Sequence, residues 1–176
     1  MPNLSSTELK RLHRDWRPRT PGRLAIALAG VAGPFNVGAI IRTAAAYRAE
    51  WLWLTPNATG PDNPKVGKTA LGTDRYLEVI RLDSIEAIAT DARARGYRVI
   101  GVELAAGARP LHEVDLTVDT CLVLGHEDHG ISRAGLVACD ELGYLPQVGK
   151  VGSLNVATAG SIAIYEWARQ QWGRGG

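Results

Sequence analysis

The chain has 176 residues, of which 45% are apolar and 22% charged, a composition that indicates a folded globular domain and excludes a disordered or fibrous chain. The length accommodates one hydrophobic core of ordinary size, so we expect a single domain over 23–176 with a short basic arm over 1–22 ahead of it. The net charge of +2 is unevenly spread, because residues 1–23 contain six basic and two acidic side chains. This asymmetry favours an anionic partner at the arm, although a solvated helix face would give the same pattern.

The cysteines and the N-terminus indicate a cellular compartment. Cys121 and Cys139 are too widely spaced for a CxxC unit and too few for a disulfide framework. No apolar leader opens the chain, and glycines interrupt the longest uncharged run, Leu24 to Ile41, so this run suits a membrane helix poorly. We therefore expect a soluble protein of the reducing cytoplasm with no membrane partner.

The chain begins with a predicted helix, followed by apolar runs of strand length. Ser5 and Glu8 have the spacing of a capping box, which predicts a helix that runs to about Trp16. The six expected strands are Leu24 to Ala29, Trp51 to Leu54, Leu77 to Ile80, Arg98 to Glu103, Cys121 to Leu124 and Leu142 to Leu145.

Helical patterns separate these strands. Apolar residues recur at helical spacing from Val37 to Ala45 and from Ile85 to Ala92. A last helix, expected over about Asn155 to Gln171, has small residues along one side, which suit packing on the sheet or a subunit interface. The alternation of strands and helices predicts an α/β fold with a mostly parallel sheet flanked by helices.

Several familiar sites are excluded by spacing. Gly67-Lys68-Thr69 resembles the end of a P-loop, but Asp62 stands where the first glycine is required. Neither a GxGxxG after the first strand nor a GxSxG elbow is present, which argues against Rossmann-type dinucleotide binding and serine hydrolysis. His126-Glu127-Asp128-His129 is one residue short of HExxH, so no metal site is expected.

Three polar clusters punctuated by glycine remain, over 36–42, 125–132 and 152–155. Each follows an expected strand or opens a helix, and ligands of parallel α/β sheets bind at the carboxyl ends of the strands. Taken singly, Asn36 and Asn155 could be helix caps, and Arg42 and Glu127 could be solvated surface groups. Because all three clusters lie at strand ends or helix starts, together they favour a ligand-binding site.

These clusters resemble, in order, motifs one, two and three of the SpoU (TrmH-type) RNA 2′-O-methyltransferases. The runs are Asn36-Val-Gly-Ala-Ile-Ile-Arg42, Leu122-Val-Leu-Gly125-His-Glu127-Asp-His-Gly130-Ile-Ser132 and Gly152-Ser153-Leu154-Asn155-Val156-Ala157. The resemblance implies the SPOUT fold with a C-terminal trefoil knot, S-adenosylmethionine as cofactor and a homodimer. Arg48, His126 and Ala157 depart from the residues common at those positions, which leaves the substrate specificity open.

The resemblance also implies residue roles. Arg42 would be the central catalytic residue, with Asn36 and Glu127 holding the arginine and the nucleotide in place. The other implied catalytic residues are Ser153 and Asn155. The implied cofactor-binding residues are Val102, Gly125, Leu145, Ser153 and Leu154. Because a guanidinium has a pKa above about 12, Arg42 is better suited to stabilise a developing alkoxide than to act as a base.

The resemblance and the basic arm together suggest an RNA substrate. The RNA-binding residues expected are Lys10, Arg11, Arg14, Arg17 and Arg42. The short arm and the pattern Thr73-Asp74-Arg75-Tyr76 resemble enzymes that methylate a D-loop guanosine of tRNA. An rRNA 2′-O-methyltransferase and a non-catalytic RNA-binding dimer are the alternatives.

Overall fold

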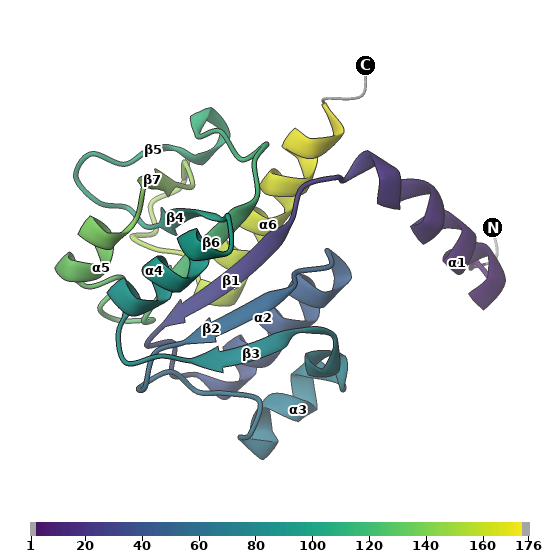
Figure 1. The fold of residues 1–176 in the computed structure, drawn as a ribbon, viewed down its shortest axis with the longest axis horizontal. Helices are drawn as coiled ribbons and strands as arrows, with labels where there is room; N and C mark the ends of the chain where they lie inside the picture. The colour runs from purple at the N-terminus through teal and green to yellow at the C-terminus, as the bar shows by residue number, and fades with distance from the viewer. Residues whose placement is uncertain (1–2, 174–176) are drawn as a thin grey trace.

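A computed structural model describes residues 3–173, and within them seven parallel strands form one sheet of order β3-β2-β1-β6-β4-β7-β5 (Figure 1). The strands are β1 (Leu24–Ala29), β2 (Trp51–Leu54), β3 (Glu78–Arg81), β4 (Arg98–Val102), β5 (Arg109–Pro110), β6 (Thr120–Gly125) and β7 (Glu141–Tyr144). The predicted parallel α/β sheet is confirmed.

Helices cover both faces of the sheet, as a parallel sheet requires. The helices are α1 (Ser6–Trp16), α2 (Pro34–Ala46), α3 (Pro64–Ala70), α4 (Ile85–Ala94), α5 (Arg133–Ala138) and α6 (Val156–Trp172). In β1, Leu24, Ile26 and Leu28 pack in a core with α2, α3 and α6, whereas Ala25 and Ala27 pack in a second core with α4. The alternating side chains of β1 therefore face two hydrophobic cores, one on each side of the sheet.

The expected strand bounds hold for β1 and β2 and shift by a residue elsewhere. Leu77 N donates to Asp74 O in a 3-10 turn, so β3 begins one residue later than expected. Leu145 lies beyond the end of β7, where its side chain lines a cavity. The short elements β5, α3 and α5 were not predicted, because each has fewer than eight residues and carries little periodic signal.

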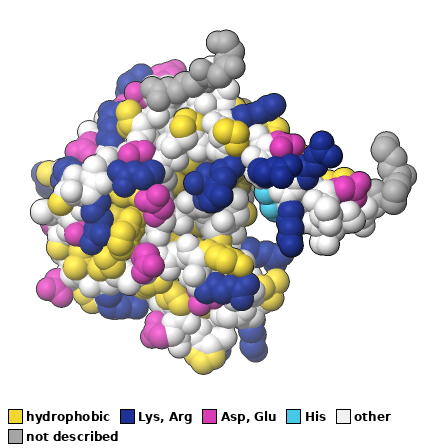
Figure 2. Space-filling model, turned by 45° about the vertical axis from the view of Figure 1, so that its right-hand side comes forward, with side chains coloured by type: hydrophobic (Ala, Val, Ile, Leu, Met, Phe, Trp, Pro, Cys, Tyr) yellow, Lys and Arg dark blue, Asp and Glu magenta, His cyan; other side chains and the backbone are white. Residues whose placement is uncertain are grey.

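The first helix projects from the body of the protein (Figures 1 and 2). The predicted capping box is present, with Ser5 accepting from Glu8 N and Glu8 accepting from Ser5 N. No residue of α1 is buried. Near its end, the Trp16 ring packs against Trp172 of α6 at 4.9 Å between centroids. The arm is therefore attached to the body mainly at its C-terminal end.

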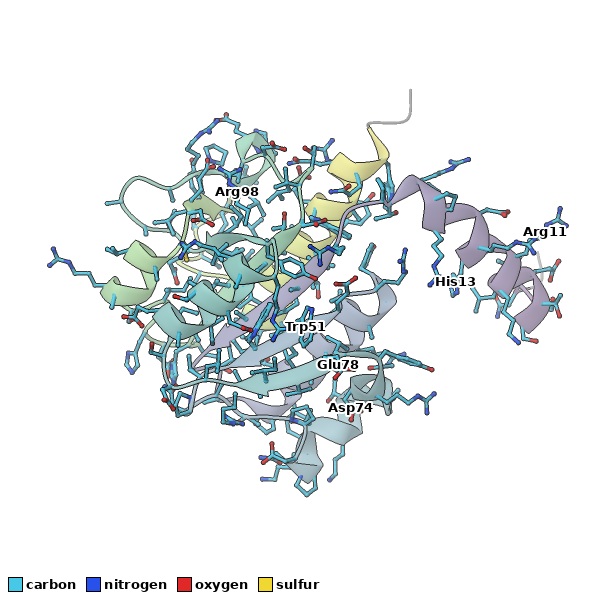
Figure 3. All side chains as sticks on the ribbon, in the orientation of Figure 1. Arg11, His13, Trp51, Asp74, Glu78 and Arg98 are labelled. Atoms are coloured by element: carbon cyan, nitrogen blue, oxygen red, sulfur yellow. The ribbon has the colours of Figure 1, made fainter. Side chains whose placement is uncertain are left out.

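The two faces of α1 differ in chemistry. Leu9, Leu12 and Trp16 are spaced to share one side of the helix, and each side chain is exposed. The basic side chains on the other side of the helix are those of Lys10, Arg11 and Arg14. Figure 3 shows Arg11 and His13 projecting from α1 at different sides of the helix. No helix of the described chain is long and apolar enough to cross a membrane.

Gly38 permits the close packing of α2 against α3. A Cβ atom at this position would lie 2.6 Å from the carbonyl oxygen of Val66 and 3.0 Å from Ala70 N. We therefore expect Gly38→Ala to lower the free energy of unfolding by about 1–3 kcal/mol, because these backbone atoms cannot rotate away as side chains can. Urea denaturation followed by circular dichroism measures this change.

Gly67 of α3 provides the matched control, since nothing lies within 4 Å of a Cβ atom added there. Gly67→Ala should leave stability unchanged or raise it by up to about 1 kcal/mol through helix propensity. Equal losses from both substitutions would contradict the role assigned to Gly38.

Candidate active site

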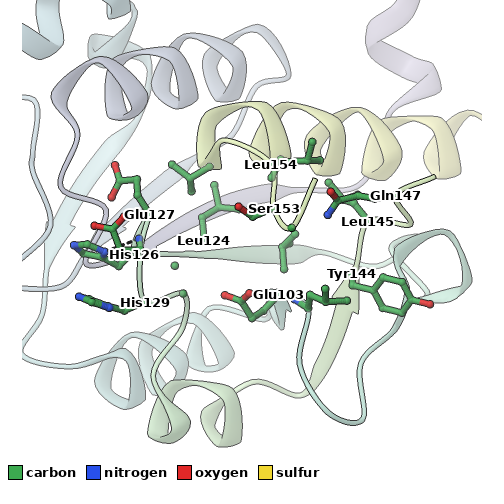
Figure 4. A pocket seen from close by; sticks show the side chains of 18 residues that line it. Glu103, Leu124, His126, Glu127, His129, Tyr144, Leu145, Gln147, Ser153 and Leu154 are labelled. Carbon is green, nitrogen blue, oxygen red and sulfur yellow. Dashed lines mark hydrogen bonds between the residues drawn. The ribbon is translucent and has the colours of Figure 1, made fainter. Parts of the chain in front are cut away.

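A cavity of about 390 Å³ opens at the carboxyl ends of β4, β6 and β7 (Figure 4). Its lining comes from the strand ends, the loop after β6, the segment before α6 and the start of α6, and it includes the polar side chains of Glu103, Glu127, Gln147 and Ser153. The cofactor-binding residues that the family resemblance implies, namely Val102, Gly125, Leu145, Ser153 and Leu154, all line it. The structure therefore brings five positions from four segments of the chain to one cavity, and their contact with a cofactor stays a prediction.

Glu127 connects this cavity to the start of α2. Its carboxylate accepts hydrogen bonds from Ala32 N at 3.0 Å, Gly33 N at 2.8 Å and Asn36 Nδ2 at 3.0 Å. The two N–H groups lie in the loop between β1 and α2. Glu127 therefore fixes the loop after β6 to the loop after β1.

These hydrogen bonds change the acidity of Glu127. Burial alone would raise the pKa of the carboxyl group, but the hydrogen bonds from Asn36 and from the N–H groups of Ala32 and Gly33 lower it to about 2. Glu127 is thus an ionised acceptor at neutral pH, and it cannot take up a proton from a substrate there.

Asn36 and Asn155 extend the same hydrogen-bond chain to α6. Asn155 Nδ2 donates to Asn36 Oδ1 at 2.9 Å, and Asn155 Oδ1 accepts from Ala157 N and Thr158 N. Asn155 is therefore the helix cap that one of the two sequence interpretations predicted. Asn36 is not a cap, because α2 begins at Pro34 and its N-cap is Gly33.

Arg42 lies apart from this chain of hydrogen bonds. It is exposed on α2, six residues beyond Asn36 and so about 9 Å further along the helix axis. Among the described residues it has no hydrogen-bond or ion-pair partner, and it does not line the cavity. In the described chain Asn36 and Glu127 bind one another and make no hydrogen bond to Arg42, so the expectation that they hold Arg42 in place stays a prediction.

Gly125 has a backbone role that the sequence did not reveal. A Cβ atom at Gly125 would lie 2.3 Å from the carbonyl carbon of Gly130 and 2.4 Å from Ile131 N. The segment between them is a tight hairpin, in which His126 and Gly130 exchange both backbone hydrogen bonds. A side chain at Gly125 would therefore disrupt the hairpin before it reached any ligand.

Two further groups at the cavity were missed by sequence reasoning. Glu103 accepts from Ile131 N at 2.9 Å, which joins the end of β4 to the hairpin. The position of Glu103 directly after an apolar strand could have indicated a site residue, but Glu103 belongs to none of the three motifs. His126 and His129 stack with ring centroids 4.8 Å apart, and only the structure shows this contact.

No group of three or more possible metal ligands occurs within residues 3–173.

The chemistry of the cavity suits S-adenosylmethionine. Val102, Leu145 and Leu154 provide apolar surface for an adenine ring, and the strand ends provide backbone polar groups for its edge. Ser153 is exposed and its hydroxyl has no hydrogen-bond partner in the described chain, so it is free to bind a polar group. The cavity is large enough for a nucleoside with a short side chain.

The pKa of Glu127 predicts how stability depends on pH. A carboxyl whose pKa falls from 4.5 in the unfolded chain to about 2 in the folded chain stabilises the protein above pH 5, and this stabilisation is lost as pH falls toward 2. We expect Glu127→Gln to lower the free energy of unfolding by about 2 kcal/mol at pH 7, after allowance for solvent screening, and by much less near pH 2.5. Chemical denaturation across this range measures the difference.

Glu78→Gln is the control, because Glu78 is exposed on β3 and its side chain has no partner in the described chain (Figure 3). Its effect should be small at every pH. A Glu127→Gln effect that did not change with pH would contradict an ionised, hydrogen-bonded carboxylate.

Comparison with known proteins identifies the family. Residues 23–165 match the SpoU rRNA methylase family. An uncharacterized tRNA/rRNA methyltransferase of Synechocystis sp. is 34% identical over 158 residues, which are 89% of this chain and 57% of that protein. The 23S rRNA (guanosine-2′-O-)-methyltransferase RlmB of Acinetobacter baylyi is 31% identical over 151 residues, 85% of this chain and 61% of RlmB. The chain thus spans about three fifths of these curated relatives.

Solved structures agree with this assignment. The SpoU methyltransferase AviRb from Streptomyces viridochromogenes, in complex with its cofactor AdoMet, matches with a TM-score of 0.76 at 29% identity, over 88% of this chain and 61% of AviRb. A structure described for the 2-OH methylation of C/U34 on tRNA matches with a TM-score of 0.76 at 32% identity, over 88% of this chain and 99% of that chain. The chain belongs to the SpoU family of RNA methyltransferases, whose cofactor is S-adenosylmethionine and whose α/β fold it has.

Proposed function

We propose that the protein is an S-adenosylmethionine-dependent RNA ribose 2′-O-methyltransferase. The observation that carries the proposal is the hydrogen-bond chain Glu127–Asn36–Asn155, which joins all three family motifs beside one cavity at the strand ends. A non-catalytic RNA-binding protein of this fold would have no need of a chain that positions a loop, a hairpin and a helix start around a small-molecule cavity. The names of the relatives support the same activity.

Cofactor binding is assigned to the cavity at the strand ends. Val102, Leu145 and Leu154 would hold the adenosine, and Ser153 would bind a polar group of the cofactor. When bound, S-adenosylmethionine supplies a methyl group that its sulfonium charge already activates for transfer. The chain's own residues then need only to exclude water, hold the ribose hydroxyl in line and stabilise the charge that develops on its oxygen.

Arg42 is the group that best suits the developing charge. A guanidinium stays protonated in proteins and so cannot accept a proton, but it stabilises an alkoxide and binds the adjoining phosphate. Because Arg42 has no polar partner among residues 3–173, its donors are available to RNA within this chain. We assign the loss of the hydroxyl proton to water or to a phosphate oxygen, since Glu127 is ionised but fully engaged with backbone and amide donors.

A homodimer is part of the proposal. The outward faces of α2 and α6 carry exposed apolar side chains, with Phe35 57%, Ile162 43% and Tyr165 50% exposed. These helices pack side by side on one sheet face, where Thr43 and Ser161 hydroxyls lie 3.2 Å apart. The two outward faces therefore form one apolar surface that also includes Arg42. A second copy on this surface would cover the apolar groups and place Arg42 at the interface.

The RNA substrate is proposed to be tRNA, at a guanosine of the D-loop, with rRNA as the second candidate. The tRNA assignment is supported by the match to a chain described for the 2-OH methylation of C/U34 on tRNA, 99% of which is covered, although the target named for that chain is a pyrimidine and not a D-loop guanosine. The rRNA candidate is favoured by the RlmB relatives, which act on 23S rRNA guanosine. Both candidates require the same chemistry.

The activity is tested by methyl transfer to unmodified RNA. We expect the purified protein to transfer methyl groups from labelled S-adenosylmethionine to a pool of tRNA and rRNA transcripts. Because the product is a ribose 2′-O-methyl group, the adjoining phosphodiester should resist alkaline hydrolysis. Nucleoside mass spectrometry after digestion identifies the methylated residue. Binding of RNA without transfer would support the non-catalytic alternative, and a product that alkali cleaves fully would indicate base methylation.

Arg42→Ala is the informative variant in this assay. It should reduce transfer by about a hundredfold or more while the affinity for S-adenosylhomocysteine, measured by calorimetry, stays within about twofold. Arg133→Ala is the matched control, because Arg133 is also an exposed arginine without a partner in the described chain. Loss of cofactor affinity in Arg42→Ala would contradict the assignment of Arg42 to the substrate.

The basic face of α1 is expected to bind RNA phosphates. Replacing Lys10, Arg11 and Arg14 by Gln keeps a good helix former at each position and removes three charges. The slope of log K against log salt should then fall in magnitude by about 2–3, since each neutralised phosphate contributes about 0.7–0.9. Fluorescence anisotropy with labelled tRNA at several KCl concentrations measures the slope.

The single variant Arg133→Gln controls for the loss of a basic side chain outside the arm. The methylated nucleotide should stay the same in the arm variant, because phosphate contacts position RNA without reading its sequence. An unchanged slope would show that the arm charges are merely solvated.

A further inference from the structure

A second cavity, of about 330 Å³, lies on the opposite side of the hairpin 125–130 from the cofactor cavity. His126, His129 and Gly130 line both cavities, so the hairpin is the wall between them. The other walls come from the ends of β1 and β2, the start of α4 and the start of α5. The residues of these walls that carry polar side chains are Thr55, Asn57, Asp83, Ser84, Glu86 and Ser132.

We propose that this second cavity binds the guanine base of the nucleotide whose ribose is methylated. The proposal rests on the proposed function, because it uses that function's ribose and cofactor. The proposal goes beyond that function because it assigns the selection of the base to particular side chains. A nucleoside with its base in the second cavity would have its ribose at the shared wall, beside the cofactor cavity.

The polar groups of the cavity match the Watson–Crick edge of guanine. Asp83 and Glu86 are exposed, and neither carboxylate has a hydrogen-bond or ion-pair partner in the described chain. Asn57 Oδ1 accepts from Thr55 Oγ1 at 2.8 Å, which leaves its Nδ2 as a donor with no partner there. Of these groups, the two carboxylates are acceptors and Asn57 Nδ2 is a donor; the Ser84 and Ser132 hydroxyls accept from Ala87 N and Gly135 N and can each still donate.

Guanine is the base that complements this set. Its N1–H and N2–H₂ groups are adjacent donors for a carboxylate, and its O6 accepts from an amide such as Asn57 Nδ2. Adenine and cytosine present a ring-nitrogen lone pair beside their amino group, which a carboxylate would repel. Uracil has one N–H between two carbonyl oxygens. The carboxylates also repel phosphate, so the cavity selects a base over the RNA backbone.

The cavity has a flat aromatic surface and a rigid rim. The stacked rings of His126 and His129 are inclined by 21°, and a base packed on them would continue the stack. The loop that carries Asn57 is held by Arg81, whose Nη1 donates to the carbonyl oxygens of Thr55 at 2.7 Å and Ala58 at 2.8 Å. The Asn57 amide is thus positioned before any ligand arrives.

Two measurements test the proposal. The first is the fraction of 2′-O-methylguanosine among the methylated nucleosides that the enzyme makes on mixed unmodified tRNA and rRNA. The second is the binding of guanosine, adenosine and inosine 5′-monophosphates, followed by the NMR signals of the Asn57 side-chain amide in ¹⁵N-labelled full-length protein. Inosine monophosphate lacks only the N2 amino group, so it isolates one of the two expected contacts.

We expect the wild-type product to be 2′-O-methylguanosine, and guanosine monophosphate to shift the Asn57 signals at concentrations about tenfold below those needed for adenosine monophosphate. Asp83→Asn, Glu86→Gln and Asn57→Asp should each lower guanosine methylation by about tenfold or more. Glu78→Gln, which removes one exposed carboxylate at the far end of β3, should leave both readouts unchanged. Affinity for S-adenosylhomocysteine should be unchanged in all four variants.

The outcomes separate this proposal from the proposed function. Methyl transfer to the ribose of another nucleoside would overturn guanine selection and leave the activity intact. Full activity and specificity in all three cavity variants would also overturn it. If no RNA is methylated, the proposed function fails, and preferential binding of guanosine monophosphate at Asn57 still decides whether the cavity selects guanine.

Discussion

The arrangement of the site depends on the ionised carboxylate of Glu127. Its hydrogen bonds to Ala32 N, Gly33 N and Asn36 Nδ2 fix the hairpin after β6 to the start of α2. These donors lie more than 90 residues away along the chain, and the pairing of β1 with β6 brings them within reach. Charge-assisted hydrogen bonds of this kind are among the stronger polar interactions in proteins, so the loop geometry follows from one side chain.

Within the family motifs, the polar residues that hold backbone segments in place differ from those that are free to bind substrate and cofactor. Asn36, Glu127 and Asn155 satisfy one another, and Asn155 also caps α6. Three of the five polar residues implied as catalytic are therefore placed to position backbone segments. Arg42 and Ser153, which have no polar partners in the described chain, remain free to bind substrate and cofactor. Different side chains of the same motifs thus hold the backbone in place and take part in the proposed reaction.

Sequence patterns predicted much of this fold for clear physical reasons. β1 and β2 were placed to the residue, because buried parallel strands are continuous apolar runs bounded by polar residues. β5 is two residues long, and α3 contains Gly67, so neither element has a periodic signal. At the site, spacing brought the motifs together at the strand ends but could not place Arg42. The direction of an exposed side chain on α2 depends on tertiary contacts that no local pattern encodes.

The distribution of charge relates the arm to the two cavities. Positive groups lie on α1, where no residue is buried and phosphates can approach from solvent. The second cavity carries the carboxylates of Asp83 and Glu86 and so repels phosphate at short range. The RNA phosphates are attracted by the arm and repelled by the second cavity. Both effects favour one orientation of the RNA, in which its backbone lies along the basic helix and a base points into the cavity. Because the long-range force is not sequence-specific and the short-range contacts are, the arm can raise the rate of encounter without reducing the selectivity of the site.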